Sequence, residues 1–247
     1  MATLSALRLR VQEPKKLCVF YVEKLGMTAR PDPDGMRVGY HGPDADLLLQ
    51  PGGLPYQHSG EDRYWKIGLC LPNLDIAVAQ LRAAGIEVTT PRQFLDIGYM
   101  CHLTDPAGFV IELLQEDFEG DRPKNAGDTA LPLGGGAHLG QITLRTGDMA
   151  TELEFYEELG MQQLSKQPVP THGFQLYFLA DTDETRPDPD LTAIRNRPWL
   201  WKRPYSVLEF QHKPGLKPHH TPALEGLEIS GLVRDQIDPA GMSVLPC

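Results

Sequence analysis

The chain has little cysteine, no excess of positive charge and no long hydrophobic run. Its 247 residues include four cysteines and no CxxC pair, so we expect no structural zinc site and the reduced thiols of a cytoplasmic protein. Because 33 acidic residues outnumber 23 basic ones, the net charge of −10 argues against nucleic acid as a partner. No apolar segment approaches the length of a membrane span, and the first residues lack the hydrophobic core of a secretory signal. The sequence therefore predicts an acidic cytoplasmic protein that binds neither nucleic acid nor membrane.

Glycine and proline are abundant, with 24 and 22 residues, which indicates many turns and short elements. Hydrophobic residues make up 41% of the chain and charged residues 23%, as in ordinary globular proteins. The length allows one large domain or two of usual size, each able to bury a core.

Several short motifs occur twice. Leu-Arg, Phe-Tyr and Leu-Gly-Met follow one another within residues 9–27 and again within residues 144–161. Asp-Pro-Ala-Gly occurs at residues 105–108 and at residues 238–241. A duplication explains both repeats. Residues 118–137 are polar and rich in Gly and Pro, so we interpret them as a linker between halves at residues 1–117 and 138–247.

The hydrophobic pattern of the first half predicts the unit strand–helix–strand–strand–strand twice. Pro14 and Gly26 suit the start and the end of the first helix, and Gly85 ends the second. The strands that we place in this half lie at residues 4–11, 36–41, 46–50, 66–71, 86–90, 98–103 and 109–114. The unit begins again with a strand at residues 139–146 and a helix capped by Asp148.

The remainder of the second half departs from this repeat. We expect strands near residues 173–179 and 205–212, and the segment between them, residues 181–204, is too polar and proline-rich for a core. The fourth unit leaves no room for a helix before its Asp-Pro-Ala-Gly turn. We therefore expect this unit to have lost its helix and two strands.

These motifs resemble those of the vicinal oxygen chelate superfamily, which includes glyoxalases, bleomycin resistance proteins and extradiol dioxygenases. The Phe-Tyr and Leu-Gly-Met motifs match the first helix of its modules, and DPAGFVIEL at residues 105–113 matches the turn and the last strand. Residues 174–179 and WLWKRPYSVLE at residues 199–209 are similar to glyoxalase I (lactoylglutathione lyase). The resemblance implies an α+β fold, in which tandem βαβββ modules form two glyoxalase-like domains and the fourth module is truncated.

In that family a metal ion lies between paired modules, and each module supplies one ligand from its first strand and a Glu from its last. In fused members with four modules, the outer two modules pair and the middle two pair. The resemblance assigns to the outer pair Ala6, Leu48, Glu228 and Leu245, which make no metal site. It assigns to the middle pair Lys66, Glu112, Gln141 and Glu209. Of these, Gln141, Glu209 and Glu112 would hold a divalent ion such as zinc or nickel, and Lys66 stands where His is expected.

Lys66 changes the chemistry of this site, because a protonated ammonium group cannot ligate a cation and repels it. Lys66 could lose its proton in a desolvated site, or it could take the metal's place and neutralise Glu112 and Glu209 directly. The sequence leaves both open, as well as a buried Lys66–Glu112 ion pair left by a decayed site. If modules three and four paired, Glu228 could join Gln141 and Glu209; otherwise we interpret Glu228 as a surface residue on a frayed terminal strand.

Two further sets of side chains have alternative roles. Arg145 matches the arginine that contacts the glutathione carboxylate in glyoxalase I. Its repeat counterpart, Arg10, belongs to a module without ligands, so a structural role for Arg145 is equally open. Three aromatic residues in or next to the polar segment at residues 181–204 either line a substrate pocket or anchor this insertion to the core: Trp199, Trp201 and Tyr205. We favour the anchoring role.

Two functions follow from the resemblance. The first is a metal-dependent lyase or isomerase of the glyoxalase I type, acting through an enediolate on a glutathione hemithioacetal or a related small oxygen-chelating substrate. Glu209 or Glu112 would be the catalytic base, glutathione the cosubstrate, and Arg145 and Lys66 the substrate-binding residues. The second is a metal-free small-molecule-binding protein in which Lys66 replaces the metal. A homodimer is also expected, because the truncated module leaves sheet edges uncovered.

Overall fold

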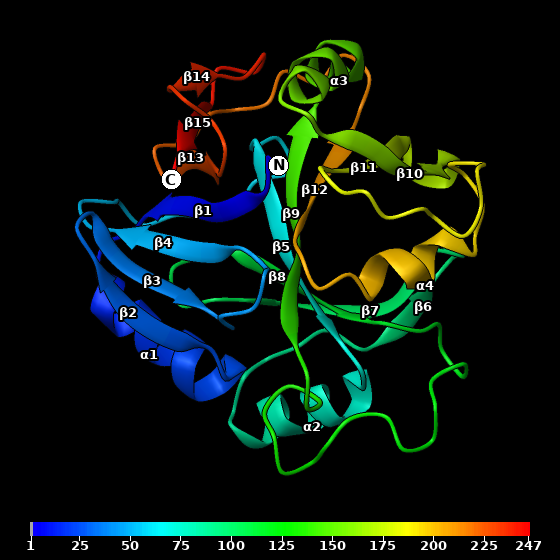
Figure 1. Cartoon of the computed structure of the whole chain (residues 1–247). Helices are drawn as coiled ribbons and strands as arrows, with labels where there is room; N and C mark the ends of the chain where they lie inside the picture. The colour runs from blue at the N-terminus through cyan, green and yellow to red at the C-terminus, as the bar shows by residue number, and fades with distance from the viewer. Residues whose placement is uncertain (1) are drawn as a thin grey trace.

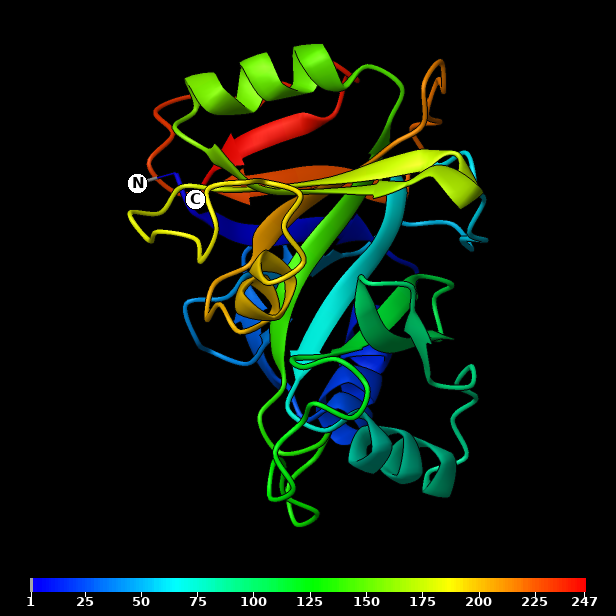
Figure 2. The same cartoon turned by 90° about the vertical axis from the view of Figure 1, so that its right-hand side faces the viewer.

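The computed structural model describes residues 2–247, which form two mixed β-sheets flanked by short helices (Figure 1). Figure 1 shows the seven-stranded sheet on the left, the eight-stranded sheet on the right, α3 at the top and α2 at the bottom. Figure 2 gives the same arrangement from the side of the eight-stranded sheet. The expected α+β fold is confirmed.

The two sheets differ in which modules they contain. The seven-stranded sheet has the order β14 (Gln236–Ile237), β15 (Ser243–Pro246), β13 (Leu224–Ile229), β1 (Leu4–Arg10), β4 (Asp46–Gln50), β3 (Gly35–Gly39) and β2 (Thr28–Asp32). The eight-stranded sheet has the order β10 (Gln162–Val169), β11 (Phe174–Ala180), β12 (Val207–His212), β9 (His138–Thr146), β5 (Tyr64–Leu71), β8 (Val110–Gln115), β7 (Gly98–Thr104) and β6 (Arg92–Phe94). The helices are α1 (Pro14–Leu25), α2 (Leu74–Ala83), α3 (Met149–Glu158) and α4 (Asn196–Trp201), with a 3₁₀ turn at Pro170–His172.

The strand order shows how the modules pair. Strand β1 of the first module pairs antiparallel with β13 of the fourth, and β5 of the second pairs antiparallel with β9 of the third. The outer two and the middle two modules therefore share a sheet, as the resemblance implies. Each half of the sequence contributes one module to each sheet, and the boundaries at residues 117 and 138 stay a prediction.

The repeated motifs connect the two sheets within each half. The Tyr21 hydroxyl donates to Asp105 Oδ2 at 2.8 Å, and the Tyr156 hydroxyl donates to Asp238 Oδ2 at 3.4 Å. Each tyrosine belongs to a Phe-Tyr motif on a helix, and each aspartate opens the Asp-Pro-Ala-Gly turn of the next module. Asp105 also accepts from the backbone N–H of Ala107, which fixes its turn. The two motifs recur together because they form one contact.

Helix limits follow the expected local chemistry. Helix α1 begins at Pro14 and ends before Gly26, whose φ of 73° lies in the left-handed region that glycine adopts without strain. Helix α3 begins after Asp148, whose side chain accepts from the backbone N–H of Thr151. Both caps agree with the prediction from sequence.

Three predictions about elements were wrong. Residues 86–90 form no strand; the edge strand β6 follows at residues 92–94. The fourth module keeps three strands, so it has lost its helix and one strand rather than two, and β14 has only two residues. The insertion at residues 181–204 does contribute to a core, because α4 buries Leu200 and Trp201.

The segment at residues 118–137 contains neither helix nor strand. It packs beside α2, where the Gln80 amide donates to the carbonyl oxygens of Thr129 and Leu131. Among residues 2–247, no helix has the length and apolar character needed to cross a membrane.

Candidate functional site

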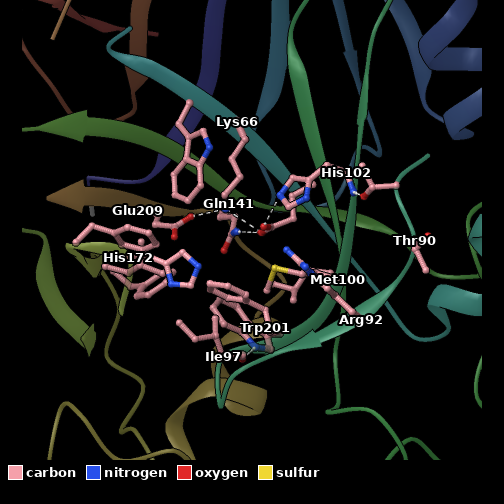
Figure 3. A pocket seen from close by; sticks show the side chains of 18 residues that line it. Lys66, Thr90, Arg92, Ile97, Met100, His102, Gln141, His172, Trp201 and Glu209 are labelled. Carbon is pink, nitrogen blue, oxygen red and sulfur yellow. Dashed lines mark hydrogen bonds and ion pairs between the residues drawn. The ribbon is translucent and has the colours of Figure 1, made fainter. Parts of the chain in front are cut away.

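A cavity of about 500 Å³ lies on one face of the eight-stranded sheet, where the two middle modules meet (Figure 3). Lys66 comes from β5, Glu112 from β8, Gln141 from β9 and Glu209 from β12, which are the four central strands of this sheet. The structure therefore brings together all four residues that the resemblance assigned to the middle pair.

Strand alternation explains why these polar side chains share a face. Their neighbours in sequence, such as Ile67, Ile111 and Ile142, are buried in the main apolar core on the opposite face. Gly68 lies opposite Gln141 in the register of β5 and β9, and a Cβ atom at Gly68 would collide with the Gln141 side chain. The glycine thus leaves the space in which Gln141 lies flat against the sheet.

Lys66 joins the two carboxylates. Its Nζ donates to Glu112 Oε1 and to Glu209 Oε2, each at 2.8 Å. The Gln141 amide nitrogen donates to Glu112 Oε1 at 2.7 Å, and the Thr143 hydroxyl donates to Glu209 Oε2. All five side chains are buried, and Lys66 is only 2% exposed.

The single ammonium group of Lys66 shifts the pKa values of the two buried carboxyl groups to different extents. Burial disfavours the charged Lys66, but Glu112 and Glu209 outweigh this effect and raise the pKa of Lys66. Burial would also raise the pKa of Glu112, but Lys66 and His102 reverse the shift and lower it. For Glu209, burial and the nearby Glu112 outweigh Lys66, so the pKa of Glu209 is raised. With Lys66 charged and both carboxylates ionised, the cluster carries a net charge of −1.

These residues do not fit a divalent metal ion. The ammonium nitrogen already lies within hydrogen-bond distance of both carboxylates, so a cation bridging them would stand beside a fixed positive charge. Within residues 2–247, no group of three or more His, Cys, Asp or Glu side chains is arranged to hold a metal. Of the interpretations left open, the geometry favours a charged Lys66 in the metal's place.

His102 belongs to the site but was not identified from the sequence. Its Nε2 lies 3.1 Å from Glu112 Oε2, and the two residues are opposite each other in the register of β7 and β8. Predicting the β7–β8 hairpin register from the turn at residues 105–108 would have placed His102 beside Glu112.

Arg145 lies on the same face of β9 as Gln141, four residues further along the strand, but it is not among the residues that line the cavity. Its guanidinium donates to Gln211 Oε1 at 2.9 Å and to the carbonyl oxygens of Ser59, Asp62 and Tyr64 at 3.0–3.2 Å. These contacts tie the loop before β5 to β9. Substrate binding by Arg145 stays a prediction.

The cavity walls are mainly apolar and aromatic, and several separate segments supply them. Strand β11 contributes Phe174 and Phe178, strand β5 contributes Trp65, and the insertion contributes Trp201. The Trp201 indole N–H donates to the carbonyl oxygen of Ile97 at 3.3 Å, which fixes α4 to the β6–β7 hairpin. Trp201 therefore both anchors the insertion and lines the cavity, whereas Trp199 and Tyr205 are not among the lining residues.

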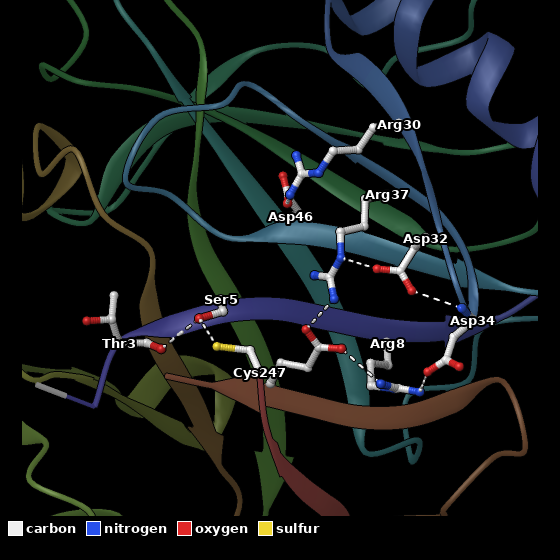
Figure 4. A network of polar contacts seen from close by, with 10 residues as sticks. Thr3, Ser5, Arg8, Arg30, Asp32, Asp34, Arg37, Asp46 and Cys247 are labelled. Carbon is white, nitrogen blue, oxygen red and sulfur yellow. Dashed lines mark hydrogen bonds and ion pairs between the residues drawn. The ribbon is translucent and has the colours of Figure 1, made fainter. Parts of the chain in front are cut away.

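The outer pair of modules holds an ion-pair network where the middle pair holds the cavity site (Figure 4). Glu228 accepts from Arg8 at 2.8 Å and from Arg37 at 2.7 Å, and it is 2% exposed. The interpretation of Glu228 as a surface residue on a frayed strand was wrong, because two arginines compensate its buried charge. Nor can it join Gln141, which lies in the other sheet.

Comparisons with known proteins agree with this fold. The model of the Glyoxalase/Bleomycin resistance protein/Dioxygenase superfamily matches residues 3–113. A protein of Pseudomonas aeruginosa, named as uncharacterized, is 30% identical over 142 residues, which cover 53% of this chain and 97% of that protein. The crystal structure of glyoxalase I from Zea mays has a TM-score of 0.71 and 17% identity, and the match covers 100% of this chain and 92% of that one. The chain therefore belongs to the glyoxalase/bleomycin resistance protein/dioxygenase superfamily, as its repeated motifs indicated.

Proposed function

We propose that this protein binds a small molecule in the cavity of the middle modules, with Lys66 in place of a metal ion. The observation that carries the proposal is the pair of 2.8 Å contacts from the Lys66 ammonium group to Glu112 and Glu209. A charged lysine in this position satisfies the buried carboxylates that a cation would otherwise have to neutralise.

The cavity itself supports binding. Its volume of about 500 Å³ falls in the range of ordinary ligand pockets, roughly 300–1,000 Å³. Aromatic walls around a small polar cluster are also typical of such pockets, because the walls supply affinity and the polar groups fix orientation.

Elemental analysis of the untagged protein tests the proposal. We expect less than a tenth of an equivalent of zinc, nickel or any other divalent metal, both as purified and after dialysis against excess metal followed by removal of free ions. About one equivalent of a metal that is lost in Glu209→Ala would overturn the proposal.

A glyoxalase I-like lyase is the second candidate. It is supported by the similarity to the Zea mays enzyme over the whole chain and by Glu209, a carboxyl group of raised pKa on the cavity wall. In this role Glu209 or Glu112 would move the proton, Gln141, Glu112 and Glu209 would hold the ion, and Arg145 would contact glutathione. This lyase role requires the Lys66 side chain to move away from the two carboxylates. Turnover of methylglyoxal plus glutathione by the wild type with zinc or nickel, abolished in Glu209→Gln, would support it.

We also propose a cytoplasmic homodimer. The four cysteines are free thiols, and three of them are buried, as expected for a reducing compartment. In the truncated module, Val233 is 95% exposed and precedes the short edge strand β14, and Ile237, within β14, is 60% exposed. Light scattering should give about twice the chain mass of 27.5 kDa, and a mass near 27.5 kDa would refute the dimer.

A further inference from the structure

We infer that the cavity selects a flat aromatic carboxylate that also bears a hydroxyl or amino group as a hydrogen-bond donor. The inference rests on the proposed function and specifies the class of ligand. It follows from an unpaired acceptor among the central strands, an unpaired cation on the edge strand β6 and the aromatic walls between.

The unpaired acceptor is the side-chain oxygen of Gln141. The Gln141 amide nitrogen donates to Glu112 Oε1 at 2.7 Å, and because a carboxylate only accepts, this contact fixes which amide atom is the oxygen. That oxygen is buried and has no hydrogen-bond partner among residues 2–247, although Gln141 lines the cavity. A buried acceptor without a partner is unfavourable, so a ligand that donates to it gains affinity.

Glu209 offers a second acceptor nearby. Its contacts with Lys66 and Thr143 both use Oε2, which leaves Oε1 for a ligand. With Lys66 charged and both carboxylates ionised, the cluster of Lys66, Glu112 and Glu209 holds two negative charges against one positive charge, which disfavours an anionic group there. The ligand's donor therefore faces this cluster, and its carboxylate must lie elsewhere.

Arg92 supplies the place for the carboxylate. It lies on β6 opposite Met100, so it shares the cavity face with Met100 and His102, and Figure 3 shows its side chain reaching into the cavity. No hydrogen bond or ion pair joins its guanidinium to another side chain of residues 2–247. Strand β6 is separated from β8, which carries Glu112, by β7, so an extended ligand can reach both groups. A guanidinium matches the geometry of a carboxylate.

The body of the ligand must be flat and apolar. Trp65, Phe174, Phe178 and Trp201 contribute four rings to the cavity, and ring pairs favour offset or edge contacts with another aromatic group. Phe94 is on β6, and His172 is in the 3₁₀ turn between β10 and β11; their ring centroids lie 5.1 Å apart. This contact brings the β6–β7 and β10–β11 hairpins together at the cavity. A fused bicyclic ring fits these walls better than a flexible chain.

Calorimetric titration with one aromatic series tests the inference. The probes are 6-hydroxy-2-naphthoate, its methyl ether, which lacks the donor, its methyl ester, which lacks the charge, and the ether ester, which lacks both. We expect the hydroxy acid to bind best, with about tenfold weaker binding for each single change.

Two variants assign the groups. In Arg92→Gln the preference for the acid over the ester should fall from about tenfold to none, while the preference for hydroxyl over ether persists. Arg234→Gln removes an exposed arginine of the truncated module and is the matched control, in which both preferences should stay.

The outcomes separate this inference from the proposed function. Equal binding of the four probes, or binding of none, would overturn the inference, as would an acid preference that survives in Arg92→Gln. The metal content of the same samples is measured in parallel, because one equivalent of bound metal would overturn the proposed function whatever the probes do.

Discussion

Replacing Lys66 by methionine should reveal how strongly this lysine holds the site together. Methionine matches the aliphatic part of the lysine side chain and removes only the ammonium group. The two contacts of 2.8 Å are then lost, and Glu112 and Glu209 face each other without compensation.

The magnitude follows from the distances and the burial. At an effective dielectric constant of about 20, each 2.8 Å contact corresponds to a gross attraction of about 6 kcal/mol. The desolvation cost of the ammonium disappears with it, so the net loss is smaller. Removing one member of a buried ion pair typically destabilises a protein by about 3–5 kcal/mol, which we expect for Lys66→Met near pH 8.

The loss should depend on pH in a defined direction. Without Lys66, the pKa of each carboxyl rises above its unfolded value, so the variant is favoured at low pH and loses stability as the pH rises. The difference in unfolding free energy between wild type and Lys66→Met should therefore be small at pH 5 and largest at pH 8, measured by urea denaturation with tryptophan fluorescence.

Lys217→Met is the matched control, because Lys217 is exposed, and it should change stability by less than about 0.5 kcal/mol. A loss of unfolding free energy for Lys66→Met below about 1 kcal/mol at pH 8, or one that grows toward pH 5, would refute the charged lysine in this site.

Addition of zinc or nickel should stabilise Lys66→His and leave the wild type unchanged, because histidine restores a ligand where the ammonium group now lies.

Three further predictions concern the rest of the structure. Arg63 donates to Glu152 at 2.7 Å and to Asp238 at 2.5 Å in a fully buried cluster. Arg63→Met should therefore lower the unfolding free energy by about 3–5 kcal/mol. A change under about 1 kcal/mol would show that the cluster is not stabilising. The folded pKa of Glu112 is lowered, so its ionised form stabilises the protein above the unfolded pKa of about 4.5, and this stabilisation decreases as the pH falls. The loss of unfolding free energy caused by Glu112→Gln, measured by urea denaturation, should therefore shrink from pH 7 to pH 3. A loss that does not change with pH would contradict this. Trp201→Ala should cost about 3–5 kcal/mol in the same assay and weaken binding of the naphthoate probes, and normal binding would show that α4 is dispensable for the cavity.

The sequence by itself determined the modules, because they depend on short-range patterns. Apolar spacing together with Pro14 and Gly26 defined the first helix, and the repeated motifs identified the family. The apolar runs around Glu112 and Glu209 were enough to indicate carboxylates within buried strands. Elements with weak patterns, such as the polar edge strand β6, were misplaced because neighbouring strands rather than local preference hold them.

Only the tertiary structure decided how the groups of the site are arranged. The pairing of β5 with β9 brings Lys66 to Glu209, which is 143 residues away in sequence, and the ammonium group lies between two carboxylates rather than beside one. The buried arginine partners of Glu228 and the contribution of Trp201 to the cavity also depend on contacts between distant segments. Sequence patterns cannot specify these contacts, because the balance between desolvation and charge pairing exists only once the chain has folded.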